Sequence, residues 1–446
     1  MTSAVTNILR KQLLDGFKSS VDSGDNYYVA IARSDAFTPA TDVSSKAEQL
    51  KLRNSLQSVK VLSNSSFVVP TVTWTSGTVY EAYDDVNSSQ ENFYVVNSNN
   101  EVYICIEQGK DILHAAAVSI IEPSNNSVLT FKTSDGYKWR YMYKMSAAAI
   151  ENFKTSSYMP VKTLLDAPSA LSIPEEVDQK IAQDLSVDGE ILSVAVDSAE
   201  GTGYLPTSTI RITGDGTGAS FLLSADDDGI NKTEIDSDGN GVYSHGSGYT
   251  HAATIATDGT SAVLRPVIAP VGGLNADPVV SLKSTSFMLQ VDIQGDELNT
   301  IVSENDFAQV ALIKNPKRYN SDSDFTSNTG NCLKYFDTTP ASGGEFVEGE
   351  TITTSTNSSA AKVFYHDIVA NRLYYYQDQE TGFDLFSVNN IVNNVEGAAR
   401  SFQVLVLGAP DINIYSGEIL YLNNISSSIT RETNQTEDIR IVIELG

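Results

Sequence analysis

The segment DGYKWRYMYK, Asp135–Lys144, decides the fold class that this sequence predicts. An Asp-Gly pair opens it, and such pairs favour tight turns. The residues that follow alternate between Tyr137, Trp139, Tyr141 and Tyr143 on one parity and Lys138, Arg140, Met142 and Lys144 on the other. A period of two is the signature of a β-strand with two different faces. Because four aromatic side chains on one face can bury a large area, we expect this strand to anchor the core of a β-rich domain.

Length and charge narrow the classes of protein to consider. The chain has 446 residues, of which 41% are hydrophobic, so it is long enough for about two to four domains with sizeable cores. It carries 29 basic and 56 acidic residues, a formal net charge of −27. Such an acidic chain is repelled by nucleic acid and by anionic lipid, so we expect neither as a partner.

The cysteines and the N-terminus indicate the compartment. Cys105 and Cys332 are far apart and lack a CxxC context, which favours a reduced chain made in a cytoplasm. The N-terminal residues MTSAVTNILRKQLLDGF contain no apolar signal region, and no apolar run approaches the ~18 residues that span a bilayer. If the protein acts outside a cell, we expect it to be released by lysis.

The first 165 residues predict one α+β unit. The apolar spacing predicts an amphipathic helix over Thr6–Val21 and a second helix over Ser45–Val59. Strand patterns occur at 27–32, 61–74, 94–96 and 102–106, and a turn is expected around Phe37-Thr38-Pro39.

Residues 186–270 contain an internal repeat in which Gly, Asp, Ser and Thr replace helix formers. Each repeat reads as a strand, a G-x-G-Y turn, a strand and a G-T-x-A turn. The first repeat has its tyrosine at Tyr204 and its G-T-x-A turn at 216–219. The second repeat has its tyrosine at Tyr249 and its G-T-x-A turn at 259–262. Glycines permit the tight turns, and the tyrosines can pack across strands, so we expect a small all-β module. A phosphate-binding loop at Gly214–Gly218 is the alternative, but no lysine or helix pattern follows it.

The remaining sequence predicts more strands. One runs over Phe307–Ile313, and 318–345 is polar and is expected to be a loop. A second β-module is expected over 349–407, and strands at 418–422 and 438–444 end the chain.

No segment carries a catalytic signature. The four histidines, His114, His245, His251 and His366, lack HExxH or Cys/His spacing, and GxSxG and P-loop motifs are absent from the sequence. His245 and His251 could share a metal only with distant carboxylates, so surface histidines are the preferred interpretation. The run Asp236–Gly241 matches the first half of a calcium loop, but Ser247 stands where its bidentate glutamate belongs, which favours an acidic turn over weak Ca²⁺ binding.

Six segments in order resemble one family. They are 27–39, 52–74, 135–145, 310–319, 416–424 and 433–445, of which the DGYxW run and the two C-terminal segments are the most specific. The motif residues in these segments are Asp135, Gly136, Tyr137, Trp139, Tyr141, Asn315, Pro316, Gly417, Glu418 and Tyr421. In these segments the chain resembles the baseplate wedge protein of T4-like contractile-tailed phages, the subunit that occurs as a dimer in each wedge. The resemblance covers roughly 1–180, 286–320 and 408–446, and the stretches between them have the character of insertions.

The resemblance implies a fold, a role and partners. The expected fold is α+β, predominantly β, with a multi-domain β-sandwich-like core, N-terminal helices and inserted all-β modules. The expected division is 1–185 for the N-terminal core, 186–280 for the repeated insertion, 281–320 for a return to the core, 321–407 for a second insertion and 408–446 for the C-terminal core strands. The implied role is a virion structural protein of the tail baseplate without catalytic residues or cofactors. It would homodimerise and bind the wedge arm and wedge core proteins, holding the baseplate before sheath contraction.

Two other functions stay open. A receptor- or carbohydrate-binding tail module is suggested by Tyr374, Tyr375 and Tyr376 and by the G-x-G-Y turns, since exposed aromatic rings can stack on sugars. A polysaccharide-degrading enzyme would need a pair of carboxylates, and the sequence singles out no such pair.

Overall fold

The structure is a computed structural model, and it is mostly β, with 43% strand and 13% helix. The predicted class, α+β and predominantly β, is confirmed. The residues that the structure describes are 6–22, 25–33, 46–87, 89–109, 116–196, 201–204, 209–226, 229–234, 244–256, 258–297, 300–301, 303, 305–354, 358–395, 397, 399–432 and 434–445. The turn expected at 37–39 lies outside them.

The chain divides into two compact units. Unit 1 comprises residues 1–16, 66–288 and 442–446, and unit 2 comprises 17–65 and 289–441. The chain passes between the units within α1 (Asn7–Asp22), β3 (Asn64–Pro70), β16 (Ser286–Gln294) and β28 (Thr436–Glu444). This division differs from the expected N-terminal core of 1–185. Residues 17–65 belong to unit 2 because their strands pair with a strand that lies almost 300 residues later.

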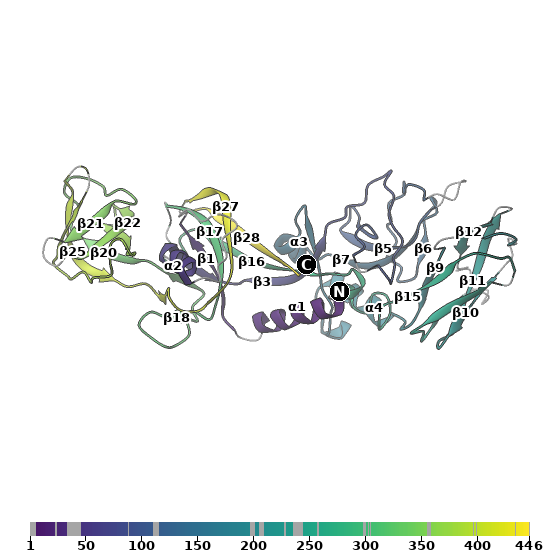
Figure 1. The fold of residues 1–446 in the computed structure, drawn as a ribbon. Helices are drawn as coiled ribbons and strands as arrows, with labels where there is room; N and C mark the ends of the chain where they lie inside the picture. Colours follow the sequence, from purple (N-terminus) through teal and green to yellow (C-terminus); the bar gives the residue numbers. More distant parts are fainter. Residues whose placement is uncertain are drawn as a thin grey trace. The chain divides into compact units, whose positions relative to one another are not determined.

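In unit 1, residues 138–144 form one strand of a four-stranded sheet, whose strands β5, β6 and β7 are labelled in Figure 1. Its strand order is β4-β5-β7-β6, with bounds β4 Tyr94–Val96, β5 Glu101–Glu107, β6 Phe131–Lys132 and β7 Lys138–Lys144. The predicted strand is therefore present as β7. Tyr137, Trp139 and Tyr141 join Tyr80 and Tyr103 in one buried cluster, as the alternation predicts.

Most of the other face of β7 is buried as well, although it carries the charged residues Lys138 and Arg140. Arg140 forms two hydrogen bonds with Glu190, at 2.7 and 2.6 Å, and Lys138 forms an ion pair with Glu107 at 2.8 Å. Since buried charges require partners, this face depends on acidic residues that β5 and the repeated module supply.

The two predicted repeats of unit 1 pack against each other reciprocally. The N–H of Ala219 donates to the Tyr249 hydroxyl at 3.4 Å, and the N–H of Ala262 donates to the Tyr204 hydroxyl at 3.3 Å. Each tyrosine ring covers a turn glycine of the opposite repeat, where an added Cβ would lie 2.4 Å from the ring. The glycines of both turns are thus required by close approach of a ring.

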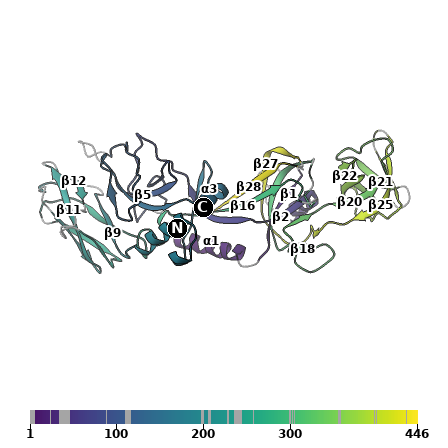
Figure 2. The ribbon, with the colours of Figure 1, turned by 180° about the vertical axis from the view of Figure 1, so that it is seen from behind.

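Antiparallel strands build this module (Figures 1 and 2). Their bounds are β9 Ile191–Val196, β10 Thr209–Gly214, β11 Thr217–Asp226, β12 Gly229–Glu234, β13 Ser244–Ser247, β14 Ala252–Ala256 and β15 Leu264–Ile268. One sheet has the order β12-β11-β10-β14 with β13 on β11, and β9 pairs with β15. The prediction of an all-β segment here is confirmed.

Short elements complete unit 1. They are β8 Tyr158–Val161, which pairs with β3, α3 Ala147–Phe153, a 3-10 turn at Pro168–Ala170, α4 Pro174–Asp184 and α5 Pro278–Ser281. Ser146 caps α3, and Asp277 caps α5, through side-chain oxygens that accept backbone N–H groups.

Unit 2 begins with a five-stranded sheet in the order β19-β2-β1-β17-β27. The bounds are β1 Tyr27–Ala32, β2 Leu56–Val61, β17 Asn305–Lys314, β19 Thr329–Asn331 and β27 Glu418–Arg431. The helix predicted to Val59 is wrong in its last turn, because α2 spans Lys46–Ser55 and the chain then enters β2. Antiparallel pairing with β1, in which Val59 faces Ala30, overrides the helical spacing.

A closed barrel follows in unit 2 (Figures 1 and 2). Its strands are β20 Lys334–Thr338, β21 Thr351–Thr354, β22 Ala360–Asp367, β23 Arg372–Tyr376, β24 Ile391–Asn394 and β25 Ser401–Gly408, in the order β20-β23-β22-β21-β24-β25. The expected loop at 318–345 is wrong, because it contains β19 and β20. Phe336 of β20 is fully buried and stacks on Tyr375 with ring centroids 4.2 Å apart. This one aromatic residue anchors β20 in the barrel core, although the sequence around it is polar. The short pair β18 Lys317–Arg318 and β26 Ile412–Asn413 lies just outside the barrel strands in sequence.

Candidate functional site

The family-resembling residues at the start of β7 hold a turn in place. The Asp135 carboxylate accepts the N–H groups of Ile120 at 2.8 Å and Ile121 at 3.0 Å, and it also accepts the Thr133 hydroxyl. Burial alone would raise the pKa of Asp135, but these donors hold that pKa below its usual range. Gly136 has a φ of +89°, which the turn requires. This carboxylate therefore acts as a fixed acceptor for a neighbouring loop.

The aromatic members of the same motif are core residues. The Tyr137 hydroxyl donates to the Ala117 carbonyl at 2.6 Å, and the rings of Tyr137 and Trp139 stack with centroids 5.5 Å apart. Tyr141 packs edge-to-face against Tyr103. These contacts support a structural role for the motif.

The second group of family-resembling residues meets at one end of the β17–β27 pair. Asn315 has a φ of +50°, its Oδ1 accepts the N–H of Asn26 at 2.9 Å, and its Nδ2 donates to Asp25 at 3.1 Å. The carbonyl of Pro316 accepts the N–H of Phe325 at 2.8 Å. The Asn-Pro turn is thus hydrogen-bonded to the residues just before β1 and to the segment that precedes β19.

Gly417, Glu418 and Tyr421 lie opposite this turn. An added Cβ at Gly417 would lie 2.9 Å from the Lys314 carbonyl oxygen. Glu418 is paired with Lys314 in the sheet register, and Tyr421 with Leu312. The structure therefore brings together five motif residues that are widely separated in the sequence.

Arg53 of α2 binds the chain next to these motif residues, at the end of the β17–β27 pair that we call the β17–β27 junction. Its guanidinium donates to the carbonyls of Ile414 at 2.7 Å, Ser416 at 2.6 Å and Gly417 at 2.8 Å. Burial lowers the pKa of Arg53, and the three carbonyls replace the water that burial removes. The sequence analysis did not single out this arginine, and no motif around it predicts the role.

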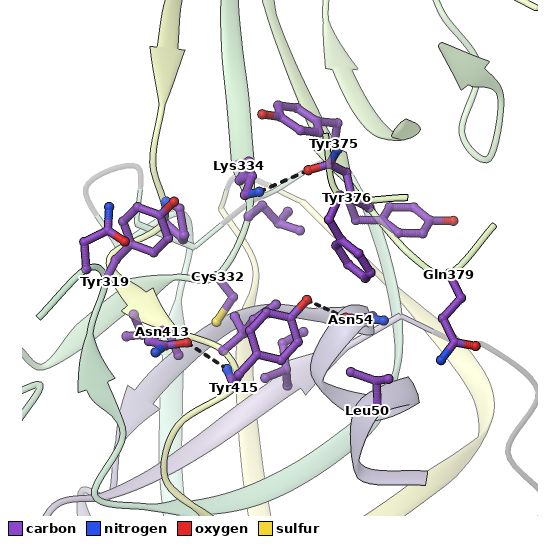
Figure 3. Close-up of a pocket in the computed structure, with 18 residues that line it drawn as sticks. Leu50, Asn54, Tyr319, Cys332, Lys334, Tyr375, Tyr376, Gln379, Asn413 and Tyr415 are labelled. Carbon is purple, nitrogen blue, oxygen red and sulfur yellow. Dashed lines mark hydrogen bonds between the residues drawn. The ribbon is translucent and has the colours of Figure 1, made fainter. Parts of the chain in front are cut away.

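A pocket of about 600 Å³ lies in unit 2 where α2 and β23 approach the β18–β26 segments (Figure 3). Five aromatic residues line it: Tyr319, Tyr375, Tyr376, Phe383 and Tyr415. Phe383 is 52% exposed and Tyr415 is 51% exposed, unusual values for large aromatic side chains. The pocket thus offers aromatic surface to a ligand.

Side-chain amides from four separate segments make up much of the polar lining of the pocket, and two of them are hydrogen-bonded to Tyr415. The Tyr415 hydroxyl donates to Asn54 Oδ1 at 3.0 Å, and the Tyr415 N–H donates to Asn413 Oδ1 at 3.1 Å (Figure 3). Because both amides accept through oxygen, their NH₂ groups are left to donate elsewhere. Asn320 and Gln379 add further amides to the lining.

Lys334 is the only charged residue that lines the pocket among the residues that the structure describes. Its Nζ donates to Gln377 Oε1 at 3.1 Å (Figure 3). The Gln377 amide nitrogen donates to the carbonyls of Ala360 and Asp384, which fixes its oxygen toward the lysine. Burial lowers the pKa of Lys334, since its partner is a neutral amide.

Two of the three consecutive tyrosines, Tyr375 and Tyr376, line the pocket, and of these only Tyr376 lies outside the buried barrel core. Tyr375 is in the barrel core, and Tyr374 packs against Tyr335 on the barrel. Tyr376 lines the pocket, and the Arg33 guanidinium lies 4.0 Å from the centroid of its ring. Sequence reasoning missed Phe383, Tyr415 and Lys334, which come from separate segments and share no local pattern.

The histidines and cysteines that the structure describes form no shared metal site. His245 is half-buried and contacts the Ile191 carbonyl at 2.7 Å, contrary to the surface position expected for it, whereas His251 is exposed beside Asp215. Cys105 and Cys332 are buried free thiols, and burial raises the pKa of each. Among the described residues, no group of three or more His, Cys, Asp or Glu side chains is arranged to hold a metal. His114 and the acidic run 236–241 lie outside those residues.

Comparisons with known proteins add no identity. No protein-family model matches the chain, and no curated protein matches it significantly. Within the described part of the chain, every helix is too short or too polar to cross a bilayer.

Proposed function

We propose that this protein is a structural subunit of a contractile phage tail baseplate wedge, where it homodimerises and binds the wedge arm and wedge core proteins. The role is assembly, and no residue is assigned to catalysis. The virion tail baseplate is the proposed location, after synthesis in the host cytoplasm.

One observation supports this proposal most. The Asn-Pro turn and the Gly-Glu-x-x-Tyr segment of the resemblance meet at the β17–β27 junction, although the whole barrel lies between them in sequence. Segments that share one structural junction are expected to persist together, whereas a closed barrel can be inserted between them. This supports the interpretation of the six ordered segments as parts of one core.

The proposal is tested by reconstitution. The purified chain is mixed with the wedge arm and wedge core subunits of the same phage, and complexes are separated by size-exclusion chromatography with mass detection. Co-elution in a defined ratio is expected. Failure to bind any wedge subunit, under conditions where those subunits bind one another, would contradict the proposal.

A second candidate function, a receptor- or carbohydrate-binding tail module, is favoured by the aromatic pocket of unit 2. Its exposed rings and fixed amides are the chemistry that binds sugars. The two functions are compatible, because the five motif residues at the β17–β27 pair are not among the residues that line the pocket.

A further inference from the structure

The aromatic faces of the pocket suit a flat, weakly apolar ligand. Phe383 and Tyr415 are about half exposed, and one face of Tyr376 is already covered by Arg33. A pyranose ring presents C–H groups on one face and hydroxyls at its edge, so it can lie on such rings while its rim stays polar. A volume of about 600 Å³ is within the range of small-molecule sites.

The amides of the pocket suit hydroxyl groups. Tyr415 binds the side-chain oxygens of Asn54 and Asn413, which leaves their NH₂ groups as the donors that these amides can offer to a ligand. A sugar hydroxyl both donates and accepts, and it can satisfy such an amide. These two asparagines come from different elements, α2 and β26, and therefore converge on the pocket only in the folded chain.

The charge of the pocket is opposite to that of the chain. The molecule carries a net charge of −27, yet among the described residues the pocket is lined by Lys334 and by no Asp or Glu. The neighbouring carboxylates are engaged elsewhere, since Asp378 pairs with Lys362 and Asp411 accepts the N–H of Asn331. Within the described part of the chain the hydrogen-bond partner of Lys334 is the neutral Gln377, and an anionic group on the ligand would complete its environment.

We propose that this pocket is a binding site for a saccharide that carries a carboxylate, with the sugar ring on Phe383 and Tyr415 and the carboxylate at Lys334. The inference deepens the second candidate function above and does not depend on the baseplate role.

The test is a glycan array that includes neutral saccharides and uronic or nonulosonic acids, probed with the full chain. A bound saccharide is then titrated by NMR as the free acid and as its methyl ester, which keeps the shape and removes the charge. We expect the ester to bind about tenfold more weakly, and Lys334→Gln to weaken binding of the acid by a similar factor.

Matched variants separate the site from the rest of the surface. Phe383→Ala is expected to weaken binding roughly three- to tenfold, the contribution of one aromatic contact. Val369→Ala, at a position 91% exposed on the same barrel, and Lys317→Gln are the controls and are expected to leave binding unchanged. Circular dichroism checks that each variant folds.

Three results would overturn the inference. An array on which the wild-type chain binds nothing removes the site. If neither Phe383→Ala nor Val369→Ala changes binding, the saccharide binds at another site and not in this pocket. Equal binding of acid and ester leaves a carbohydrate module intact but refutes the role of Lys334. None of these results bears on wedge assembly, so the two proposals fail independently.

Discussion

Replacing Glu190 by glutamine tests how the repeated module is held to β7. Arg140 and Glu190 are joined by two hydrogen bonds, at 2.7 and 2.6 Å, and their side chains are only 8% and 6% exposed. Glutamine keeps the size and can accept one of these bonds, but it leaves the guanidinium without its countercharge. We expect Glu190→Gln to lower the free energy of unfolding by about 3–5 kcal/mol, the usual cost of breaking a buried pair.

The assay is urea unfolding followed by tryptophan fluorescence, because Trp139 lies in the strand that carries Arg140. The control is Asp184→Asn, which breaks the Lys180–Asp184 pair, where the aspartate is 51% exposed. That change is expected to cost less than about 1 kcal/mol. The double variant Arg140→Met with Glu190→Met removes both charges and is expected to recover part of the loss.

The same pair predicts a pH dependence. Burial would raise the pKa of Glu190, but hydrogen bonds and attraction from Arg140 hold that pKa below its usual value of 4.5. Its stabilising contribution is therefore complete above about pH 4.5 and is lost as pH falls through the lower folded-state pKa. Wild type should lose stability in that acidic window more steeply than Glu190→Gln. A loss in Glu190→Gln no larger than that of Asp184→Asn would refute the reasoning.

Three further changes test other parts of the fold. Gly216→Ala and Gly259→Ala each place a Cβ 2.4 Å from a tyrosine ring of the opposite repeat. Each change should destabilise the module by about 1–3 kcal/mol in thermal unfolding. Gly16→Ala is the control, because its Cβ meets no atom within 4 Å, and it should leave stability unchanged. Arg53→Lys loses the planar fork that reaches three carbonyls and should cost about 1–3 kcal/mol in urea unfolding; an unchanged midpoint would contradict the role assigned to it. Replacing 334–408 with a short linker should leave the five-stranded sheet folded by circular dichroism, because the first and last barrel strands pair with each other and their ends are close; aggregation of the shortened chain would show that the barrel is needed.

Local patterns predicted the elements whose periodicity agrees with their burial. The alternation after Gly136 gives β7, and the G-x-G-Y repeats give a module in which each tyrosine packs on the other repeat. The alternation and the repeated G-x-G-Y pattern are local in sequence, although the contacts between the two repeats are not. These two patterns could therefore be read without knowing the tertiary structure.

Long-range pairing explains what the sequence did not predict. Leu56 and Val59 fit a helical spacing as well as a strand, and only the pairing of β2 with β1 decides between them. The burial of Arg140 depends on Glu190, fifty residues later, and a charged face in a strand is ordinarily taken as solvent-exposed. The strand at Leu56–Val59 and the burial of Arg140 both depend on residues that are distant in sequence, so neither could be predicted from the neighbouring residues alone.

The pocket was predictable only in part. Three consecutive tyrosines suggested an aromatic site, but alternation along β23 buries Tyr375 in the barrel core, so that of the two tyrosines lining the pocket only Tyr376 lies outside that core. Phe383, Tyr415 and Lys334 reach the pocket from three separate segments. No spacing between them could have indicated a shared site.

The most direct test of the proposed wedge role is the mass of the purified chain in solution by multi-angle light scattering. The proposal predicts a stable dimer, twice the 48.2 kDa of one chain, that persists on dilution. A monomer at every concentration would contradict a dimeric wedge subunit, and a trimer would indicate a fibre or spike instead.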